Sequence, residues 1–213
     1  MPNKLCVQTL VHCDLAEVAK IHCSIFPESL IAKLGIECVT KYYEWQLESP
    51  DEVYAIGAFT SEKMLGYCFG GVFSMALGGF LVRNKGLIIM RLIFRPWLLF
   101  YPVFIRKILR GLSILIRFSK NKDTTTKAPP IFEDSHFGIL AIATDPAERG
   151  LGVGRLLMEH SEQFAKAQNF TKMYLSVNPQ NINAVQFYEH VGWIKDGDTE
   201  IWQGGMKKEL MSD

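Results

Sequence analysis

A glycine-rich segment between an expected strand and an expected helix constrains the fold of this chain most. The segment covers residues 145–155 and reads DPAERGLGVGR, after an apolar stretch over 137–144 and before a helix-like stretch over 156–168. Glycine lets the backbone turn tightly and approach a ligand without a Cβ in the way. A helix N-terminus offers unpaired N–H groups and the positive end of a dipole, which suit an anion such as a pyrophosphate. The segment therefore predicts a phosphate cradle between a strand and a helix.

The spacing of these glycines excludes the two common nucleotide loops. A P-loop ends in Gly-Lys-Ser/Thr, whereas this segment has Gly154, Arg155 and Leu156 at that point. A dinucleotide fingerprint places G-x-G-x-x-G directly after the strand, whereas this chain has G-x-G-x-G after a turn over residues 145–148. A glycine-rich turn without a ligand remains the alternative for the segment taken alone.

A second motif lies downstream, at and after the start of another expected helix. A short strand around residues 175–177 leads into turn residues, and Asn181 is suited to cap a helix that ends at Gly192. Asn181 and Tyr188 are seven residues apart, so they share one side of the helix, with the small Ala184 between them. From the helix alone, Asn181 is best interpreted as a cap and Tyr188 as a packing residue.

Together, the two motifs resemble those of the GNAT superfamily of N-acetyltransferases. Arg149, Gly152 and Gly154 match the family's Arg/Gln-x-x-Gly-x-Gly/Ala loop, and residues 181–193 match its second motif as N-x-x-A-x-x-x-Y-x-x-x-G-W. The resemblance covers residues 130–195 tightly and the N-terminal part loosely. It implies an α/β fold of the GNAT type, in which helices flank a mixed central β-sheet.

The rest of the chain is consistent with a single GNAT acyltransferase domain over residues 1–213. Asp14 and Glu17 resemble a capping box at a helix start, and His22 is expected to pack inside that helix's apolar face. A last strand is expected over 201–210, with a bulge at its two adjacent glycines. The elements expected before the insertion are a strand, two helices and a hairpin of two strands, over residues 5–10, 15–26, 30–47, 53–60 and 64–73.

The resemblance implies an enzyme that transfers an acetyl group from acetyl-CoA, as co-substrate, to a primary amine by direct attack. The acceptor would be a small molecule or an amino sugar, and no metal would take part. Family members hold the pantetheine arm through the backbone of the fourth strand and the pyrophosphate through the glycine loop. The matching residues are Ile142, Ala143 and Thr144 for the arm, and Arg149, Gly150, Leu151, Gly152, Val153, Gly154 and Arg155 for the pyrophosphate.

The resemblance also gives roles to the second motif, in which Asn181 contacts CoA and Tyr188 protonates the departing thiolate. A phenol is a reasonable proton donor for that step because its pKa, which exceeds that of a thiol, keeps it protonated at neutral pH. The proton acceptor departs from the family pattern. Relatives carry a glutamate at one of two positions, which are here Ser176 and about Gly138, and neither residue can accept a proton.

His136 is the first candidate for the missing base. It lies two residues before Gly138 on the same strand face, and the usual imidazole pKa of about 6.5 suits a proton acceptor. An ordinary surface histidine at a strand end is the alternative, and Glu133 and Asp134 are further candidates. A depressed amine pKa or a chain of waters could also replace a dedicated base. A non-catalytic acyl-CoA-binding regulatory module therefore remains a second hypothesis for the function.

An insertion over residues 74–130, between the expected third and fourth strands, departs from the GNAT pattern. From Lys63 to Lys122 the chain has eleven Lys or Arg residues and no Asp or Glu, among long apolar stretches. These charges interrupt each stretch that could span a bilayer. The pattern predicts a basic, hydrophobic helical insertion, followed by a linker over 121–130. The helices would pack on the sheet or in a dimer interface, with their basic residues simply solvated. Alternatively, they would contact an anionic membrane surface, as a peripheral acyltransferase for a lipid-linked acceptor would, or bind nucleic acid.

Composition narrows the partners and the location. A net charge of +1 gives no overall attraction to nucleic acid. Five cysteines, none with C-x-x-C spacing, indicate reduced thiols and no zinc site. The first residues lack the charged and apolar regions of a signal peptide. We therefore expect a cytoplasmic protein, with the membrane surface as the alternative location, and with a small-molecule amine rather than nucleic acid as its partner.

Overall fold

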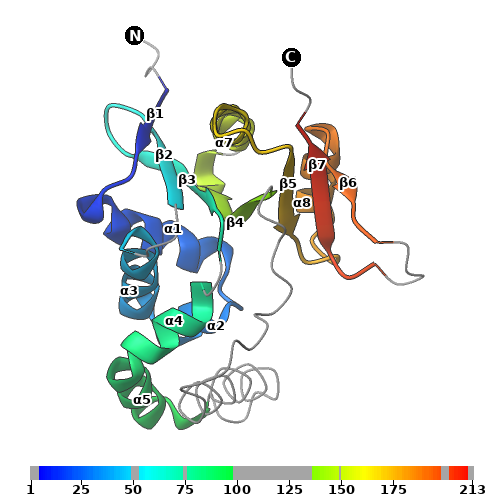
Figure 1. Ribbon diagram of the computed structural model, residues 1–213. Helices are drawn as coiled ribbons and strands as arrows, with labels where there is room; N and C mark the ends of the chain where they lie inside the picture. The colour runs from blue at the N-terminus through cyan, green and yellow to red at the C-terminus, as the bar shows by residue number, and fades with distance from the viewer. Residues whose placement is uncertain are drawn as a thin grey trace. The chain divides into compact units, whose positions relative to one another are not determined.

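The computed structural model describes residues 5–48, 53–73, 76–97, 136–148, 150–197 and 202–210, which form two compact units (Figure 1). The first unit contains the described residues up to Leu10, those over 53–73 and those from 136 onward. The second unit contains residues 11–48 and 76–97. The organisation as one domain over residues 1–213 stays a prediction.

Several residues named in the sequence analysis lie outside the described residues. They are Arg149 of the glycine loop, Glu133 and Asp134 as further candidate bases, Ile201 of the last strand, and the insertion beyond residue 97 with its expected linker.

A seven-stranded mixed sheet forms the centre of the first unit, with strands in the order β1-β2-β3-β4-β5-β7-β6. Neighbouring strands run antiparallel except β4 and β5, which run parallel. The expected mixed sheet flanked by helices is confirmed (Figure 1). The strands are β1 Cys6–Thr9, β2 Val53–Phe59, β3 Met64–Gly71, β4 His136–Thr144, β5 Lys172–Ser176, β6 Ile194–Lys195 and β7 Gly205–Glu209.

Helix α7, Val153–Ala167, connects the parallel strands β4 and β5, because parallel neighbours require a crossover. It packs on β2, β3 and β4. Its buried residues recur at helical spacing. Each fully buried Leu or Met among them contributes about 1.5–3 kcal/mol to the free energy of folding. The buried residues of this face are Val153, Leu157, Met158, Ser161 and Ala165.

Helix α8, Ile182–His190, lies beside β5 and β7 (Figure 1). Its end is held by β7, where Lys208 Nζ donates to the carbonyl of Val191 at 2.7 Å. The same Nζ lies 2.6 Å from Glu162 Oε1 of α7. Gly192, with φ of 87°, ends the helix as expected, because a left-handed residue there suits glycine. Lys208 therefore joins α7, α8 and β7.

The second unit is helical, and α3 contacts α1, α2 and α4. His22 packs inside it as predicted: its Nδ1 lies 2.9 Å from the Tyr43 hydroxyl and its Nε2 lies 3.0 Å from Ser29 Oγ. The described helices of this unit are η1 His12–Asp14, α1 Leu15–Ile25, α2 Leu30–Leu34, α3 Ile36–Leu47, α4 Ala76–Arg83 and α5 Lys85–Phe94.

Three local predictions differ from the structure. The single helix expected over 30–47 is two, because Gly35 has φ of 109°, a backbone conformation that favours glycine and breaks the helix. The Asp14 carboxylate does not cap α1; it accepts from the Val11 N–H at 2.9 Å, since a 3-10 turn precedes the helix. Gly204, with φ of 97°, precedes β7 instead of forming a bulge within it.

Residues 76–94 of the insertion form α4 and α5. Basic side chains of these helices and Arg95, the C-cap of α5, meet groups of α2, of α3 and of Glu48, the C-cap of α3. Arg83 pairs with Glu48, and Arg91 pairs with Glu37. Arg95 donates to the carbonyl of Lys33 at 2.8 Å. The described part of the insertion thus finds ion-pair and hydrogen-bond partners on neighbouring elements, so its three described arginines are not simply solvated.

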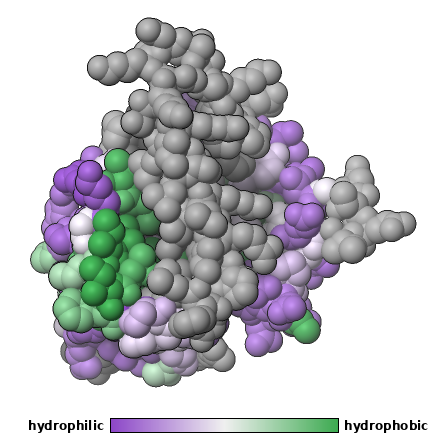
Figure 2. Space-filling view, turned by 90° about the horizontal axis from the view of Figure 1, so that it is seen from below, coloured by the Kyte–Doolittle hydropathy of each residue, from purple (hydrophilic) through white to green (hydrophobic). Residues whose placement is uncertain are grey.

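Away from these contacts, α4, α5 and the described residues up to Trp97 carry large exposed apolar side chains, and Figure 2 shows an apolar area on the surface. These side chains define what we call the apolar face of the insertion. Across the described part of the chain, no helix combines the length and the hydropathy needed to cross a bilayer. The large exposed side chains of the apolar face are Val82, Ile89, Met90, Ile93, Phe94 and Trp97.

Candidate functional site

The second half of β4 pairs with β3 on one side, up to Thr144. On the other side, its registered pairs with β5 end at Ile139 and Leu175, although β4 continues to Thr144. A bulge places the additional residue Leu140 in β4 opposite the step from Phe69 to Gly70 of β3. Backbone N–H and C=O groups on the β5 side of residues 140–144 are therefore without a strand partner among the described residues. This half-strand includes Ile142, Ala143 and Thr144, the residues expected to hold the pantetheine arm.

The glycine loop leads directly into α7. Gly150 has φ of 89° and Gly152 has φ of 73°, and a Cβ at either position would meet nothing within 4 Å. Gly152 is the N-cap and contributes no side-chain bond, and the first intrahelical bond runs from the Leu156 N–H to the Gly152 carbonyl at 2.9 Å. The N–H groups of the three residues between them therefore have no intrahelical partner. Open backbone N–H groups at the start of a fifteen-residue helix suit an anion.

The half-strand, the loop and α8 meet at Gly154. A Cβ at Gly154 would lie 3.4 Å from Phe187 Cζ of α8 and 3.7 Å from Thr144 Cγ2 of β4. These are ordinary van der Waals distances, so the half-strand, the start of α7 and α8 lie close together here without a requirement for glycine. The resemblance predicts that the glycine loop and the second motif form one site. The start of α7 and helix α8 do lie next to each other at Gly154 and Phe187.

The remaining loop side chains are placed differently. Val153 is buried in the core, whereas Leu151 is exposed. Arg155 points along its own helix, where its Nε lies 2.8 Å from Glu159 Oε1. A cavity of about 330 Å³ opens beside it, lined by Arg155, Met158, Glu159, Glu162, His190, Val191, Gly192 and Lys208.

In the second motif, Asn181 caps α8 as predicted, because its side chain accepts from the Ala184 N–H at 3.2 Å. Tyr188 is 9% exposed and packs against Trp193, with ring centroids 6.2 Å apart. Burial raises the pKa of Tyr188. Among the described residues, the Tyr188 hydroxyl has no hydrogen-bond partner. Asn181 is thus a helix cap and Tyr188 a packing residue, as the helix alone predicted. Their contacts with CoA stay predictions.

His136 opens β4 at the end away from the glycine loop. It is eight residues before Thr144, which corresponds to about 26 Å along a strand. Its ring lies edge-on to Tyr174 of β5, with centroids 5.0 Å apart. Its Nδ1 is buried without a hydrogen-bond partner among the described residues. His136 is registered with Lys172 of β5, and Gly138, two residues on, with Tyr174, so His136 belongs to the part of β4 that β5 still covers.

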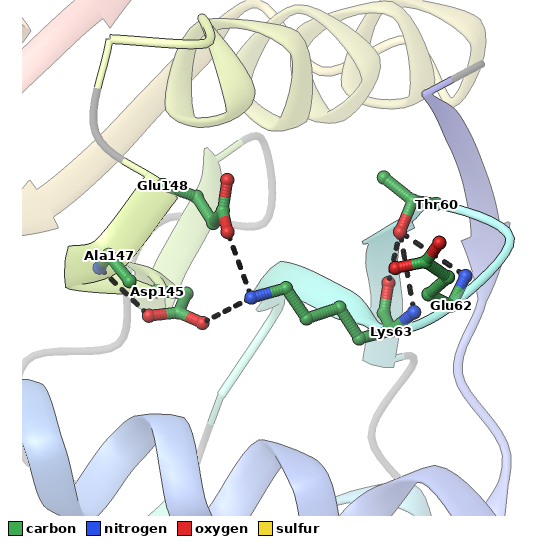
Figure 3. Close-up of polar contacts among 6 residues, drawn as sticks. All are labelled: Thr60, Glu62, Lys63, Asp145, Ala147 and Glu148. Atoms are coloured by element: carbon green, nitrogen blue, oxygen red, sulfur yellow. Dashed lines mark hydrogen bonds and ion pairs between the residues drawn. The ribbon is translucent and has the colours of Figure 1, made fainter. Parts of the chain in front are cut away.

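One contributor was missed by sequence reasoning. Lys63, in the β2–β3 turn, contacts Asp145 and Glu148 immediately before the glycine loop (Figure 3). Its hydrogen bond to Glu148 is the main cause that raises the pKa of Lys63. Position 63 is part of an expected hairpin turn, and no sequence signal connects it to a segment 82 residues away. In the described parts of the chain, no group of three or more His, Cys, Asp or Glu side chains is placed to hold a metal ion.

A comparison with protein families is consistent with this arrangement. The model of the acetyltransferase (GNAT) family matches residues 15–193. The chain belongs to this family. The resemblance inferred from the two motifs is thereby confirmed.

Curated relatives match shorter stretches. A peptidyl-lysine N-acetyltransferase of Escherichia coli, YjaB, is 41% identical over 72 residues, which are 34% of this chain and 46% of that protein. A streptothricin acetyltransferase of Streptomyces lavendulae is 34% identical over 64 residues, 30% of this chain and 34% of that protein. The matched stretch is thus less than half the length of each relative.

Solved structures share the fold over nearly the whole chain. The PaiA N-acetyltransferase of Thermoplasma acidophilum, solved in complex with coenzyme A, has a TM-score of 0.57 at 14% identity and covers 97% of this chain and 99% of its own. The ribosomal-protein-S18-alanine N-acetyltransferase of Escherichia coli has a TM-score of 0.55 at 14% identity, covering 99% and 96%. At such identities the likeness shows the fold alone.

Proposed function

We propose that the protein is an acetyl-CoA-dependent N-acetyltransferase that acts on a primary amine. The single observation that carries the proposal is the open start of α7 beside the half-strand of β4. Backbone N–H groups after Gly152 suit a pyrophosphate, and the unpaired backbone of residues 140–144 suits the amides of a pantetheine arm. A ligand with both groups on one chain fits both features.

Each part of acetyl-CoA has a proposed set of contacts. The pyrophosphate lies on the backbone from Gly150 to Arg155, and the arm pairs with Ile142, Ala143 and Thr144. Arg149, which precedes Gly150 in the sequence, is a further proposed contact. Asn181 already uses its side-chain oxygen as a cap, so its amide N–H₂ is the group that remains for a ligand. Acetyl-CoA supplies an acetyl group activated as a thioester.

Tyr188 is proposed to assist departure of the thiolate. The amine nitrogen forms a bond to the acetyl carbon while the carbon–sulfur bond breaks, and the electron pair stays on sulfur. Because burial raises the pKa of Tyr188, its hydroxyl stays protonated at neutral pH and can donate to that sulfur. Full transfer of the proton runs uphill against a thiol pKa of about 8.5, so stabilisation of the thiolate by the hydrogen bond is its main contribution.

His136 is proposed as the acceptor of the amine proton. A neutral imidazole accepts a proton through one ring nitrogen, and its Nδ1 is not engaged by the described residues. The covered half of β4 separates His136 from the loop, so His136 can act if the acceptor approaches from the β4 N-terminal half. If His136 has no role, deprotonation falls to water or to an amine of depressed pKa.

The acceptor is proposed to be a primary amine on a small molecule or an amino sugar. The names of the two relatives include a peptidyl lysine and the compound streptothricin, so both macromolecular and small acceptors belong in the test. An assay of thiol release from acetyl-CoA, with a panel of amines and lysine peptides, tests the activity. CoA binding without turnover of any acceptor would instead support the non-catalytic regulatory module.

The role of Tyr188 is tested by Tyr188→Phe, for which we expect about a 10- to 100-fold lower kcat with an unchanged Kd for CoA. Tyr42→Phe is the matched control, because Tyr42 is similarly buried and its pKa is also raised by burial, yet it lies in the helical unit. Equal turnover of Tyr188→Phe and wild type would remove Tyr188 from the mechanism.

The exposed apolar face of the insertion supports a further contact outside the chain. The sequence left a membrane surface and a dimer interface open, and both stay proposals. Flotation with phosphatidylserine vesicles and size-exclusion chromatography separate them, with Ile93→Glu/Phe94→Glu as the test variant. If the wild type binds vesicles and the variant does not, the face contacts a membrane. If the wild type is a dimer and the variant is not, the face is a dimer interface. If both proteins are monomers that do not bind vesicles, the proposed contact is refuted.

A further inference from the structure

Lys63 joins two segments that are far apart in the sequence. Its Nζ lies 2.9 Å from Glu148 Oε1 and 3.3 Å from Asp145 Oδ2 (Figure 3). Lys63 belongs to the turn between β2 and β3, whereas Asp145 immediately precedes η3, Pro146–Glu148, and Glu148 is its last residue, after β4. One ammonium group therefore bridges a hairpin to the turn that precedes the glycine loop.

Both ends of this bridge are held by further hydrogen bonds. On the hairpin side, the Thr60 N–H donates to the Lys63 carbonyl at 2.9 Å, and the Lys63 N–H donates to Thr60 Oγ1 at 3.3 Å. On the other side, the Asp145 N–H donates to the Leu65 carbonyl at 2.7 Å, and Asp145 Oδ1 accepts from the Ala147 N–H at 2.9 Å. The contact thus connects two turns that are each held by hydrogen bonds of their own.

The position of the bridged turn matters because the glycine loop comes directly after it. The turn lies between Thr144, the end of β4, and Gly150, the start of the left-handed loop positions. Its two carboxylates stand next to backbone that suits an anion, where uncompensated negative charge opposes a phosphate. Lys63 supplies a positive charge to both and fixes where they lie.

We propose that Lys63 is a positioning residue for the phosphate-binding loop: it holds the turn 145–148 against the β2–β3 hairpin and keeps its carboxylates from opposing the CoA pyrophosphate. This inference rests on the proposed use of the loop for CoA. Lys63 acts through Asp145 and Glu148 and not by touching the phosphates. Its effect should therefore appear in the binding of donors that carry phosphates.

The expected effect is moderate, because the Lys63 side chain is 44% exposed and those of Asp145 and Glu148 are 25% and 30% exposed. Exposed ion pairs are weak individually, so two of them together correspond to about a 3- to 10-fold change in an equilibrium constant. In Lys63→Met we expect the Kd for CoA to rise by about 5-fold, and less at high salt, where exposed charges are screened.

The test uses the full chain and titration calorimetry with CoA, dephospho-CoA and pantetheine. Lys63→Met should weaken CoA and dephospho-CoA to the same extent and leave pantetheine, which has no phosphate, unchanged. Lys63→Arg keeps the charge and should bind CoA like the wild type. Lys172→Met is the matched control, because Lys172 is 39% exposed, pairs with Glu209 and lies at the far end of β5.

The outcomes separate this inference from the proposed function. Wild-type affinity for CoA in Lys63→Met, or an equal loss for pantetheine, overturns the positioning role while leaving the CoA site intact. An equal loss in Lys172→Met also overturns it, because total charge would then explain the effect. A wild-type protein that fails to bind CoA defeats the proposed function and this inference together.

Discussion

Replacing Lys208 by Met is expected to destabilise the protein more than any exposed lysine substitution. The side chains of Lys208 and Glu162 are 20% and 17% exposed, so the substitution leaves a largely buried carboxylate without its counter-charge. It also removes the donor that reaches the Val191 carbonyl at the end of α8. Breaking a fully buried pair costs about 3–5 kcal/mol and an exposed one about 0–1 kcal/mol. For this intermediate exposure we expect the free energy of unfolding to fall by about 2 kcal/mol.

The assay is urea unfolding followed by circular dichroism, with the melting temperature as a second measurement. For a chain of this length, about 2 kcal/mol corresponds to a fall in Tm of about 4–8 °C. Lys172→Met is again the control, because its pair with Glu209 is 39% and 60% exposed and should contribute less than about 0.5 kcal/mol. A double-mutant cycle with Glu162→Gln should give a coupling energy of about 1–2 kcal/mol.

An equal loss of stability in Lys208→Met and Lys172→Met would contradict this expectation. Burial would then not determine the strength of these pairs. A large loss with no coupling to Glu162 has a different meaning: the contact with the Val191 carbonyl, and not the ion pair, would hold the end of α8.

Two other substitutions test the loop and the helical unit. Gly152→Ala places a Cβ in open space but at φ of 73°, which is unfavourable for alanine. We therefore expect the free energy of unfolding to fall by about 1–2 kcal/mol and CoA binding, measured by calorimetry, to weaken. Gly86→Ala is the control, because it also places a Cβ in open space but within helix α5, and it should be neutral or stabilising. His22 has its pKa lowered to about 4 by burial, from 6.5, so stability is fully present above pH 6.5 and is lost as the pH falls towards 4, by at most about 3 kcal/mol. Urea unfolding of wild type and His22→Gln between pH 7 and 4 measures this loss, and parallel pH dependences of the two proteins would contradict it.

The sequence predicts the local parts of the site well, because short-range chemistry determines them. Gly152 and Gly192 take left-handed conformations, and Asn181 caps its helix, since each depends on neighbours within a few residues. The break at Gly35 is local too, but the apolar periodicity continues across it and conceals it.

Non-local features of the site could not be predicted in the same way. The separation of β4 from β5 depends on where the pairing between these two distant segments stops, and the residue types over 140–144 do not indicate that point. The contact of Lys63 with Asp145 likewise depends on which two turns the sheet brings together. Whether His136 acts as a base depends on how an acceptor approaches, so the residue type alone does not decide its role.

The early end of the β4–β5 register gives the sheet an edge in its interior. An exposed edge is prone to pair with any available strand, and proteins normally protect it. Here the arm of a CoA molecule, which carries amides of its own, would act as the missing strand and close the sheet. Amide hydrogens of residues 140–144 that face this gap should then exchange rapidly in the free protein and slowly with CoA bound. The ligand would thus be part of the fold, and its concentration would set the stability of this region.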